Sequence, residues 1–523
     1  MYKVVKDIKP NRPIDEIIKA NNELFETIYV TNSIYFKQNL SEYLEKIGVV
    51  DDDNVLLHDF FINPYHTKLY SKYCASLLLK EIIEIQRLQD YNILVNTEDE
   101  LNYFSLAHKD LTFKLAKKSS IQQVLIGLIK QLQSTWLAYA ITCLIFLLHK
   151  ITGKIKRSKL EVGDYIFLEF FCLNGDINSV FRYYTKDFIS KLIHSGAELI
   201  LFPIIDYSKV MPWSIQDEIS FEGKTLKIIY DLDYISNPKR LKSYKFSSIE
   251  VRGVELTKQI IKEYKQKRNQ LSYFKNYEMF FSKIRSHGIR IKTYYDWWEN
   301  QPIDKIISYS ISKNLPNCQH IGVIDYMIDT DYNYYLKILK EDLTRKVVPS
   351  QFLCWSEIYF RSINLSEKVV FKKLHSSRLN IANTPSYKVI QKQESKKLRV
   401  LIILPIIIDE AKNLLKLSEA IKELNIYYRI KDHPAIKGSF QIDESIIEKE
   451  NISNCISNYH LVITAITSAA LEAALLKKEV ILTSSSWYIQ DPLKHFINRD
   501  SYEKIGTNQV ILERIIQTYG IKK

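Results

Sequence analysis

The chain has 523 residues, of which 46% are hydrophobic and 25% are charged, and its formal net charge is +13. That length predicts at least two domains, and the composition excludes a chain that is mainly disordered. The six cysteines show no Cys-x-x-Cys spacing, which argues against a zinc site or a disulfide framework. We therefore expect a multidomain globular protein.

The positive charge raises the question of an anionic partner, which could be nucleic acid, a membrane surface or an anionic substrate. The sequence contains no RRM, zinc-finger or helix-turn-helix signature, and its lysines are not interleaved with aromatic residues that could stack on bases. We therefore predict no nucleic-acid partner. Residues 1–7 contain no continuous apolar segment, so we expect no secretory signal and a cytoplasmic protein.

Residues 121–150 form the most apolar part of the chain, and a basic cluster at 150–159 follows. A membrane-spanning helix needs about 20 apolar residues, and Lys130 interrupts this segment. A helix lying in the interface of the membrane explains both the apolar and the basic residues. We predict peripheral attachment to the inner face of the cytoplasmic membrane, with a buried core helix as the main alternative and a membrane span as a further one.

Strand and helix signals alternate after residue 164. Apolar runs at 165–173 and 197–203 predict buried strands, and a helical pattern at 179–195 connects them. This is the pattern of a βαβ unit, in which ligands bind in the loops that follow the strands.

A strand predicted at 289–295 leads into a loop rich in aromatic, acidic and amide residues. Its carboxylates are candidate acid–base groups, with Glu299 as first choice, Asp296 as second and Asp304 as third. The residues predicted to bind the acceptor are Trp297, Trp298, Asn300, Gln301 and Asp304. Pro302 should begin the next helix. The alternative is that this loop closes a domain edge and that the tryptophans fill the core.

The run Trp298-Glu299-Asn300-Gln301 resembles a loop of bacterial surface-carbohydrate biosynthesis proteins. This resemblance implies an acceptor site for a surface glycan.

Two strands in the last third of the chain also carry unusual polar residues. One, at 427–434, ends in Lys431-Asp432-His433-Pro434, and the other, which begins at 461, turns through Thr467 and Ser468 into a helix that contains Glu472. Helix N-termini bind phosphate, because their free N–H groups and the helix dipole point toward the ligand. We expect His433 and Ser468 to lie at the ends of two neighbouring strands and to contact one cluster of ligand oxygens.

Together these residues resemble the nucleotide-binding half of bacterial sialyltransferases, capsule Kdo transferases and polyglycerol-phosphate polymerases. The resemblance implies an α/β fold with two Rossmann-like domains facing a cleft, known as GT-B, and no metal or other cofactor. It also implies donor binding by Lys431, His433, Pro434, Thr467, Ser468 and Glu472, with His433 also catalytic. The turn departs from the family pattern, which often reads Ser-Ser where this chain has Thr467-Ser468.

The recurrence of βαβ patterns predicts an acceptor-side domain at 1–325 and a nucleotide-sugar domain at 326–500, with a hinge between Gly322 and Lys346. The strand at 347–353 would begin the second domain. In the C-terminal segment 501–523, residues 508–519 should form a helix that crosses back onto the first domain, as is usual in the resembled fold.

Two Asp-x-Asp spacings, Asp231 to Asp233 and Asp329 to Asp331, could hold a metal, but such spacings arise by chance in a chain with many acids. We therefore expect metal-independent transfer of a sugar from a nucleotide-activated donor to a growing surface glycan or lipid-linked glycan. The resemblance suggests a capsule or lipopolysaccharide product and a CMP-linked acidic sugar donor. The alternatives are a CDP-alditol phosphotransferase of the polyglycerol-phosphate type and a non-catalytic scaffold of a polysaccharide assembly complex.

Overall fold

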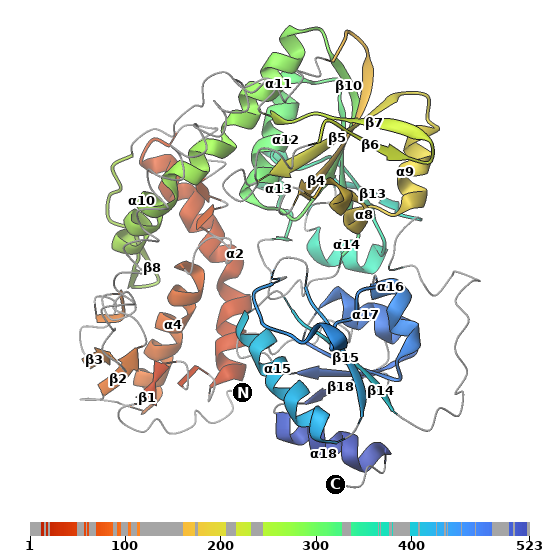
Figure 1. Ribbon diagram of the computed structural model, residues 1–523. Helices are drawn as coiled ribbons and strands as arrows, with labels where there is room; N and C mark the ends of the chain where they lie inside the picture. The colour runs from red at the N-terminus through yellow and green to blue at the C-terminus, as the bar shows by residue number, and fades with distance from the viewer. Residues whose placement is uncertain are drawn as a thin grey trace. The chain divides into compact units, whose positions relative to one another are not determined.

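The computed structural model describes residues 12–115 with short gaps, 160–326 without 173–175, 206–215 and 232–243, 336–379 with short gaps, 398–483 with short gaps, 502–505 and 508–519. The chain divides into two compact units. One comprises Met1–Ile324 and Tyr334–Lys372, and the other comprises Asp325–Asn333 and Lys373–Lys523. Each unit contains its own largely parallel sheet with helices packed on it (Figure 1). The prediction of an α/β protein with two Rossmann-like domains is therefore confirmed, whereas the cleft between them stays a prediction.

The sheet of the first unit has the order β13-β12-β11-β10-β4-β5-β7-β6. Its strands are β4 (Asp164–Cys172), β5 (Glu198–Ile205), β6 (Glu218–Phe221), β7 (Lys224–Ile228), β10 (Arg290–Trp297), β11 (Gln319–Ile324), β12 (Gln351–Cys354) and β13 (Val370–Lys373). From β4 the chain runs outward to β5 and the β6–β7 hairpin, then returns to the other side of β4 and continues outward from β10. The strand order therefore reverses between β4 and β10, which is where open α/β sheets bind ligands.

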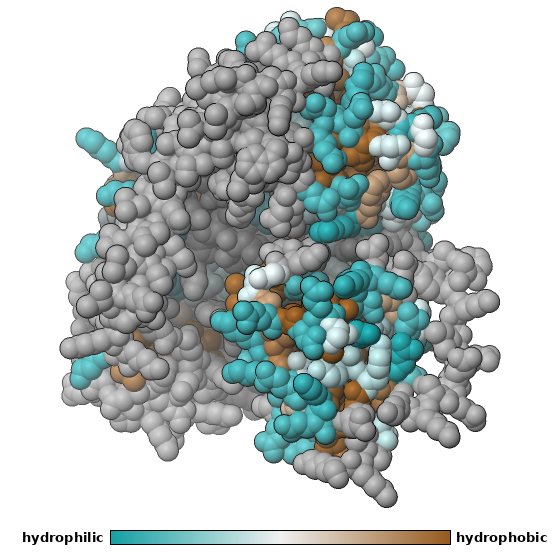
Figure 2. Space-filling model, in the orientation of Figure 1, coloured by the Kyte–Doolittle hydropathy of each residue, from teal (hydrophilic) through white to brown (hydrophobic). Residues whose placement is uncertain are grey.

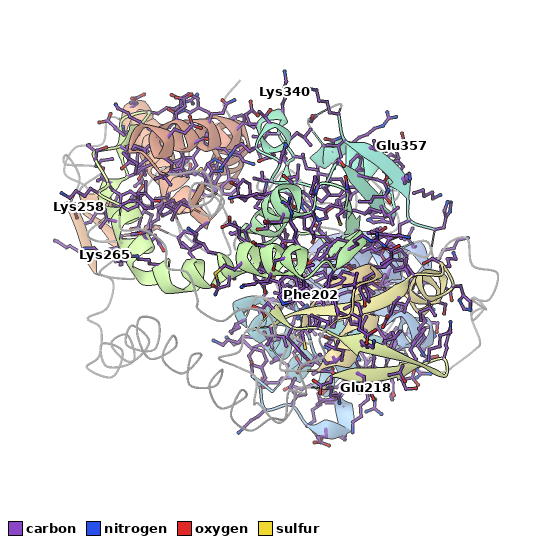
Figure 3. The ribbon with its side chains drawn as sticks, turned by 90° about the horizontal axis from the view of Figure 1, so that it is seen from above. Phe202, Glu218, Lys258, Lys265, Lys340 and Glu357 are labelled. Atoms are coloured by element: carbon purple, nitrogen blue, oxygen red, sulfur yellow. The ribbon has the colours of Figure 1, made fainter. Side chains whose placement is uncertain are left out.

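Helices connect the strands of this unit. They include α8 (Val180–Tyr183), α9 (Lys186–Ile193), α10 (Thr257–Phe274), α11 (Asn276–Ser286), α12 (Pro302–Asn314), α13 (Lys340–Thr344) and α14 (Glu357–Ile363). Aromatic rings fill the layer between α11 and the sheet. For example, Phe202 of β5, which is labelled in Figure 3, stacks on Phe280 of α11 with ring centroids 4.8 Å apart. An N-terminal part adds α2 (Asn22–Lys46), α4 (Leu69–Gln86) and a small parallel sheet of β1 (Arg12–Pro13), β2 (Asn92–Val95) and β3 (Thr112–Leu115).

The sheet of the second unit has the order β15-β14-β16-β17-β18, and all its strands are parallel. These strands are β14 (Arg399–Ile403), β15 (Tyr427–Lys431), β16 (Leu461–Thr464), β17 (Glu479–Thr483) and β18 (Tyr502–Ile505). From β14 the chain moves to β15 on one side and then returns past β14 to β16. The order reverses between β14 and β16, so this gap is the expected ligand position of the second sheet.

Two helices, α15 (Ile408–Glu423) and α18 (Asn508–Tyr519), pack on one face of this sheet. Leu414 and Leu417 of α15 and Ile511 of α18 share one buried core with Val400 and Ile463 of the strands. The outer side of α15 carries exposed lysines, and Figure 2 shows a mostly hydrophilic surface over this helix. The short helix α17 (Ser468–Leu475) packs on β16 and β17.

The boundary between the units lies further along the chain than the sequence predicted. The strand predicted at 347–353 forms β12, which pairs with β11 in the first sheet, so it does not begin the second domain. The predicted hinge residue Gly322 lies inside β11, and the chain makes its last crossing between the units at Lys372 and Lys373. A residue pattern indicates that a segment is a strand, but it does not show which strand it pairs with. For this reason the sequence assigned 347–353 to the wrong domain.

The prediction that the C-terminal helix crosses back onto the first domain is also wrong. The helix has the predicted extent, but Asn508 Nδ2 donates to the Asn413 carbonyl at 2.9 Å, and Ile511 and Ile515 pack into the core beneath α15. Residues 502–505 supply the last strand of the second sheet. The tail therefore completes the second unit.

The predicted membrane-interface helix at 121–150 lies outside the described residues. In the parts of the chain that are described, none of the helices combines the length and apolar character that crossing a bilayer requires.

Gly322 occupies a position where the sheet leaves no room for a side chain. It pairs with Phe352 of β12, and a Cβ atom at this position would lie 2.3 Å from the Phe352 ring. Trp298 and Phe360 hold that ring, with centroids at 4.9 and 5.6 Å. The ring therefore has little freedom to move away.

We predict that Gly322→Ala destabilises the protein by about 1 to 3 kcal/mol, because the added methyl group overpacks this core. Urea unfolding measures the change. Adding Phe352→Leu should restore part of the lost stability, since it removes the ring that the methyl group meets. An unchanged midpoint in Gly322→Ala would contradict the packing argument.

A buried ion triad joins three separate helices of the first unit. Asp342 of α13 lies 2.9 Å from the Lys305 ammonium of α12 and 3.6 Å from the Lys37 ammonium of α2, and all three side chains are almost fully buried. Its Oδ2 also accepts from the Leu339 N–H at 2.8 Å. Burial alone would raise the pKa of Asp342, but the two lysines and the N–H group outweigh it and hold this pKa well below its usual value.

Replacing Asp342 with Asn should cost about 3 to 5 kcal/mol at pH 7, because two buried ammonium groups lose their counter-charge. The folded state lowers the pKa of Asp342, so its contribution is present above the unfolded pKa of about 3.9 and is lost as the pH falls below it. Urea unfolding between pH 7 and pH 3 should therefore show a flatter pH dependence in Asp342→Asn than in the wild type. Glu357→Gln, which breaks an exposed pair with Arg361, is the matched control and should change little.

Candidate functional site

The loop after β10 lies at the reversal point of the first sheet. The strand continues two residues past its predicted end, so Asp296 and Trp297 belong to β10 rather than to the loop. Asn300 has φ +54°, a left-handed conformation that favours glycine and is tolerated by asparagine. Pro302 begins α12 as predicted, and the Asp304 carboxylate accepts from the Gln301 N–H at 2.8 Å. This N-terminal cap fixes how the loop turns into the helix.

Three carboxyl groups meet beneath this loop. Glu169 of β4, Asp296 of β10 and Asp304 of α12 are each 0% exposed, and one oxygen of each lies within 4.8 Å of the others. Tyr295 of β10 pairs with Leu168 of β4. The next residue of each strand, Asp296 and Glu169, therefore lies beside the other. We call these residues the carboxyl trio.

Each member of the trio is held through one of its oxygens. Glu169 Oε2 accepts from the Tyr294 hydroxyl at 2.7 Å, Asp296 Oδ2 lies 3.1 Å from His320 Nε2, and Asp304 Oδ2 accepts from the Glu299 and Gln301 N–H groups. The other oxygen of each group is buried and has no hydrogen-bond partner among the described residues. The trio is therefore oriented by the protein, and three of its oxygens are left without a partner.

Burial raises the pKa of all three carboxyls well above their usual values, and the charge of Asp296 raises those of Glu169 and Asp304 further. Burial also lowers the pKa of His320 to about 3, so its imidazole is neutral and does not offset the negative charge. Lys305, which follows Asp304, pairs with Asp342 instead.

Glu299 differs from the trio because it is only half-buried. Its Oε1 accepts from the Trp297 indole N–H at 3.1 Å. Burial raises its pKa, while hydrogen bonds from Trp297 and Gln301 act in the opposite direction. Of the three predicted acid–base carboxylates, Glu299 is the one that reaches the surface, whereas Asp296 and Asp304 are enclosed.

The two tryptophans fill the core, which is the alternative that the sequence left open. The Trp297 ring meets Tyr183 and Tyr184 edge-on, at 5.0 and 5.7 Å, and the Trp298 ring meets Phe352 at 4.9 Å. Asn300 is also buried, so among the predicted acceptor-binding residues Gln301 is the one with an accessible side chain.

The second candidate site lies where β16 turns into α17. The helix begins at Ser468 as predicted, and Thr467 is its extended N-cap residue. Thr464 donates to the Ile403 carbonyl at 3.0 Å and lies 3.4 Å from the Thr467 hydroxyl, which ties this turn to β14. The hydroxyls and the first N–H groups of α17 therefore lie at the reversal point of the second sheet.

His433 and Ser468 do not come from neighbouring strands, which corrects the expectation that they meet at one cluster of ligand oxygens. Strand β14 lies between them, since Ile403 pairs with Lys431 on one side and with Thr464 on the other. Two strand spacings separate their strands by about 10 Å. A ligand must therefore extend along the edge of the sheet to contact both residues.

The remaining residues that the sequence predicted to bind the donor are Lys431, Pro434 and Glu472. The Lys431 ammonium donates to the backbone carbonyls of Glu448 and Glu450, and Glu472 is 1% exposed within α17. Pro434 lies outside the described residues. Of the Asp-x-Asp residues, Asp231 is buried, while Asp233, Asp329 and Asp331 also lie outside the described residues.

Two residues of the first site, Glu169 and His320, were absent from the sequence prediction. Glu169 had a signal, because it is a single acid inside the apolar run 165–173. A buried charge is costly and requires a specific reason. His320 gave no such signal, since its contact with Asp296 depends on the pairing of β10 with β11.

No protein-family model matches the chain, and no curated protein matches it either. Among solved structures, a glycotransferase of kitacinnamycin is 8% identical, with a TM-score of 0.36 over 69% of this chain and 91% of that one. A glycosyltransferase from Rickettsia africae is 12% identical, with a TM-score of 0.35 over 69% and 89%. The wall teichoic acid polymerase TagF is 12% identical, with a TM-score of 0.34 over 75% and 90%. These values are too low to assign a family or an activity.

Proposed function

We propose that this protein is a metal-independent glycosyltransferase of the GT-B type, which moves a sugar from a nucleotide-activated donor to a growing surface glycan. The observation that carries the proposal is that one chain contains two α/β sheets, each with polar side chains at its reversal point. Such points bind ligands, and two of them suit a reaction with two substrates.

On the acceptor side, Glu299 is the proposed general base. A raised pKa makes a carboxylate a stronger base near neutral pH, and Glu299 is partly accessible. Gln301 would bind a hydroxyl of the acceptor. Asp296 and Asp304 would position the loop from beneath, because their side chains are enclosed.

On the donor side, Thr467, Ser468 and the first N–H groups of α17 would hold a phosphate of the donor. His433 lies two strands further along the same edge and would stabilise developing charge where the donor extends over β14. Lys431 and Glu472 then support the strand end and the helix, while Pro434 keeps its predicted donor role.

The finer parts of the proposal come from the resemblance stated above. The donor is a CMP-linked acidic sugar, the acceptor is a glycan or lipid-linked glycan, and the product is a capsule or lipopolysaccharide. The basic segment after residue 150 would hold the protein at the inner face of the cytoplasmic membrane.

Glu299→Gln should lower sugar transfer by about 10²-fold or more while leaving nucleotide affinity unchanged, because it removes the base and not the donor site. The assay follows nucleotide release from CMP-sialic acid, CMP-Kdo and CDP-glycerol in the presence of membrane glycans. Release from CDP-glycerol alone would identify the phosphotransferase alternative. Glu218→Gln is the control, since Glu218 is exposed on the edge strand β6 (Figure 3). Full activity in Glu299→Gln would exclude this residue as the base.

Ser468→Ala should weaken nucleotide binding about 5- to 10-fold, because one hydrogen bond to the phosphate is lost. His433→Ala should instead lower turnover by about 10²-fold with little change in affinity, because it acts on developing charge. Calorimetry with CMP, CDP, UDP and GDP measures the affinities, and Ser445→Ala, an exposed serine of the same unit, is the control. Unchanged affinity in Ser468→Ala together with unchanged turnover in His433→Ala would refute this donor site.

A further inference from the structure

The carboxyl trio has buried oxygens that the described residues do not satisfy with hydrogen bonds. Its members come from β4, β10 and α12, so they join the two strands that flank the reversal point to the helix that follows. Each is 0% exposed, and each has one buried oxygen that finds no hydrogen-bond partner among the described residues. Burying such groups is costly unless a ligand compensates them.

The geometry suits a cation with oxygen ligands. One oxygen from each carboxyl lies within 4.8 Å of the other two, which is about twice the Ca–O distance, so all three can reach one ion of that size. A smaller ion such as Mg²⁺ would draw them to within about 4.2 Å of one another. Carboxylates are the side chains that hard divalent cations prefer, and the set contains no sulfur ligand.

Hydrogen bonds from neighbouring residues hold each carboxyl group of the trio in place, as is usual for metal ligands. Tyr294 donates to Oε2 of Glu169, His320 contacts Oδ2 of Asp296, and two backbone N–H groups donate to Oδ2 of Asp304. In metal sites, ligating carboxylates are fixed in this way by a surrounding set of hydrogen bonds.

We propose that Glu169, Asp296 and Asp304 bind one divalent cation of the Mg²⁺, Mn²⁺ or Ca²⁺ class. The ion ties β4 to β10 and to the N-terminus of α12, and so fixes the loop that carries Glu299 and Gln301. This site is separate from the donor phosphate, which lies on the second sheet in the proposed reaction. The inference therefore stands whether or not the protein transfers a sugar.

The test uses the full-length protein after treatment with a chelator and exchange into metal-free buffer. Titration with Mn²⁺, followed by electron paramagnetic resonance, should show one bound ion per chain. Saturating Mn²⁺, Mg²⁺ or Ca²⁺ should raise the Tm by about 5 °C for at least one of the three ions. A wild-type protein that binds no Mn²⁺ and gains no thermal stability from any of them would overturn the proposal.

Variants locate the ion. Glu169→Gln and Asp296→Asn keep the shape of the side chains and should lower Mn²⁺ affinity by at least 10-fold. Asp164→Asn is the matched control, because Asp164 lies at the other end of β4, on the surface, where it pairs with Arg290 and Lys292. It should bind Mn²⁺ like the wild type. If the ion is lost in Asp164→Asn, or kept in both trio variants, the trio is not the site.

Discussion

The constraint on which both candidate sites depend is the reversal of strand order within a parallel sheet. Crossover connections between parallel strands are right-handed. When the chain leaves two neighbouring strands in opposite directions, the two connections therefore run on opposite faces of the sheet, and the loops that begin them diverge. The gap opens between β4 and β10 in one sheet and between β14 and β16 in the other. Side chains at these strand ends can therefore meet a ligand without breaking the hydrogen bonds of the sheet.

In the first sheet, buried acidic side chains lie at this gap. A buried carboxylate is destabilising, so Glu169 and Asp296 of the strands and Asp304 of α12 must contribute something that an apolar core would not. The aromatic layer of Phe202, Phe280 and Tyr294 seals them from water on the side of α11. In such a low-dielectric setting a bound cation interacts strongly with its ligands, and the loop above it is held in a single conformation.

The sequence predicted the elements well and their neighbours poorly. The limits of α18, the start of α12 at Pro302 and the start of α17 at Ser468 came from local patterns, because caps and periodicity are local properties. The assignment of β12 to the wrong domain and the pairing of His433 with Ser468 both failed, since strand order is set by contacts between distant residues. The same limit hid His320. The tryptophans resemble binding residues in sequence, yet their burial depends on Tyr183 and Phe352, which lie far away along the chain.

The position of β14 between His433 and Ser468 restricts the kind of donor that the second sheet can bind. A single phosphate at the N-terminus of α17 would contact Ser468 and Thr467, but the strand of His433 is about 10 Å away across the sheet. A donor that uses both must extend along the carboxyl edge, past Leu404 and Pro405 at the end of β14. Nucleotide-activated sugars are extended in this way, with the base, the phosphate and the sugar in line. In the proposed donor site the phosphate would lie at α17, and His433 would contact the end of the donor that reaches over β14.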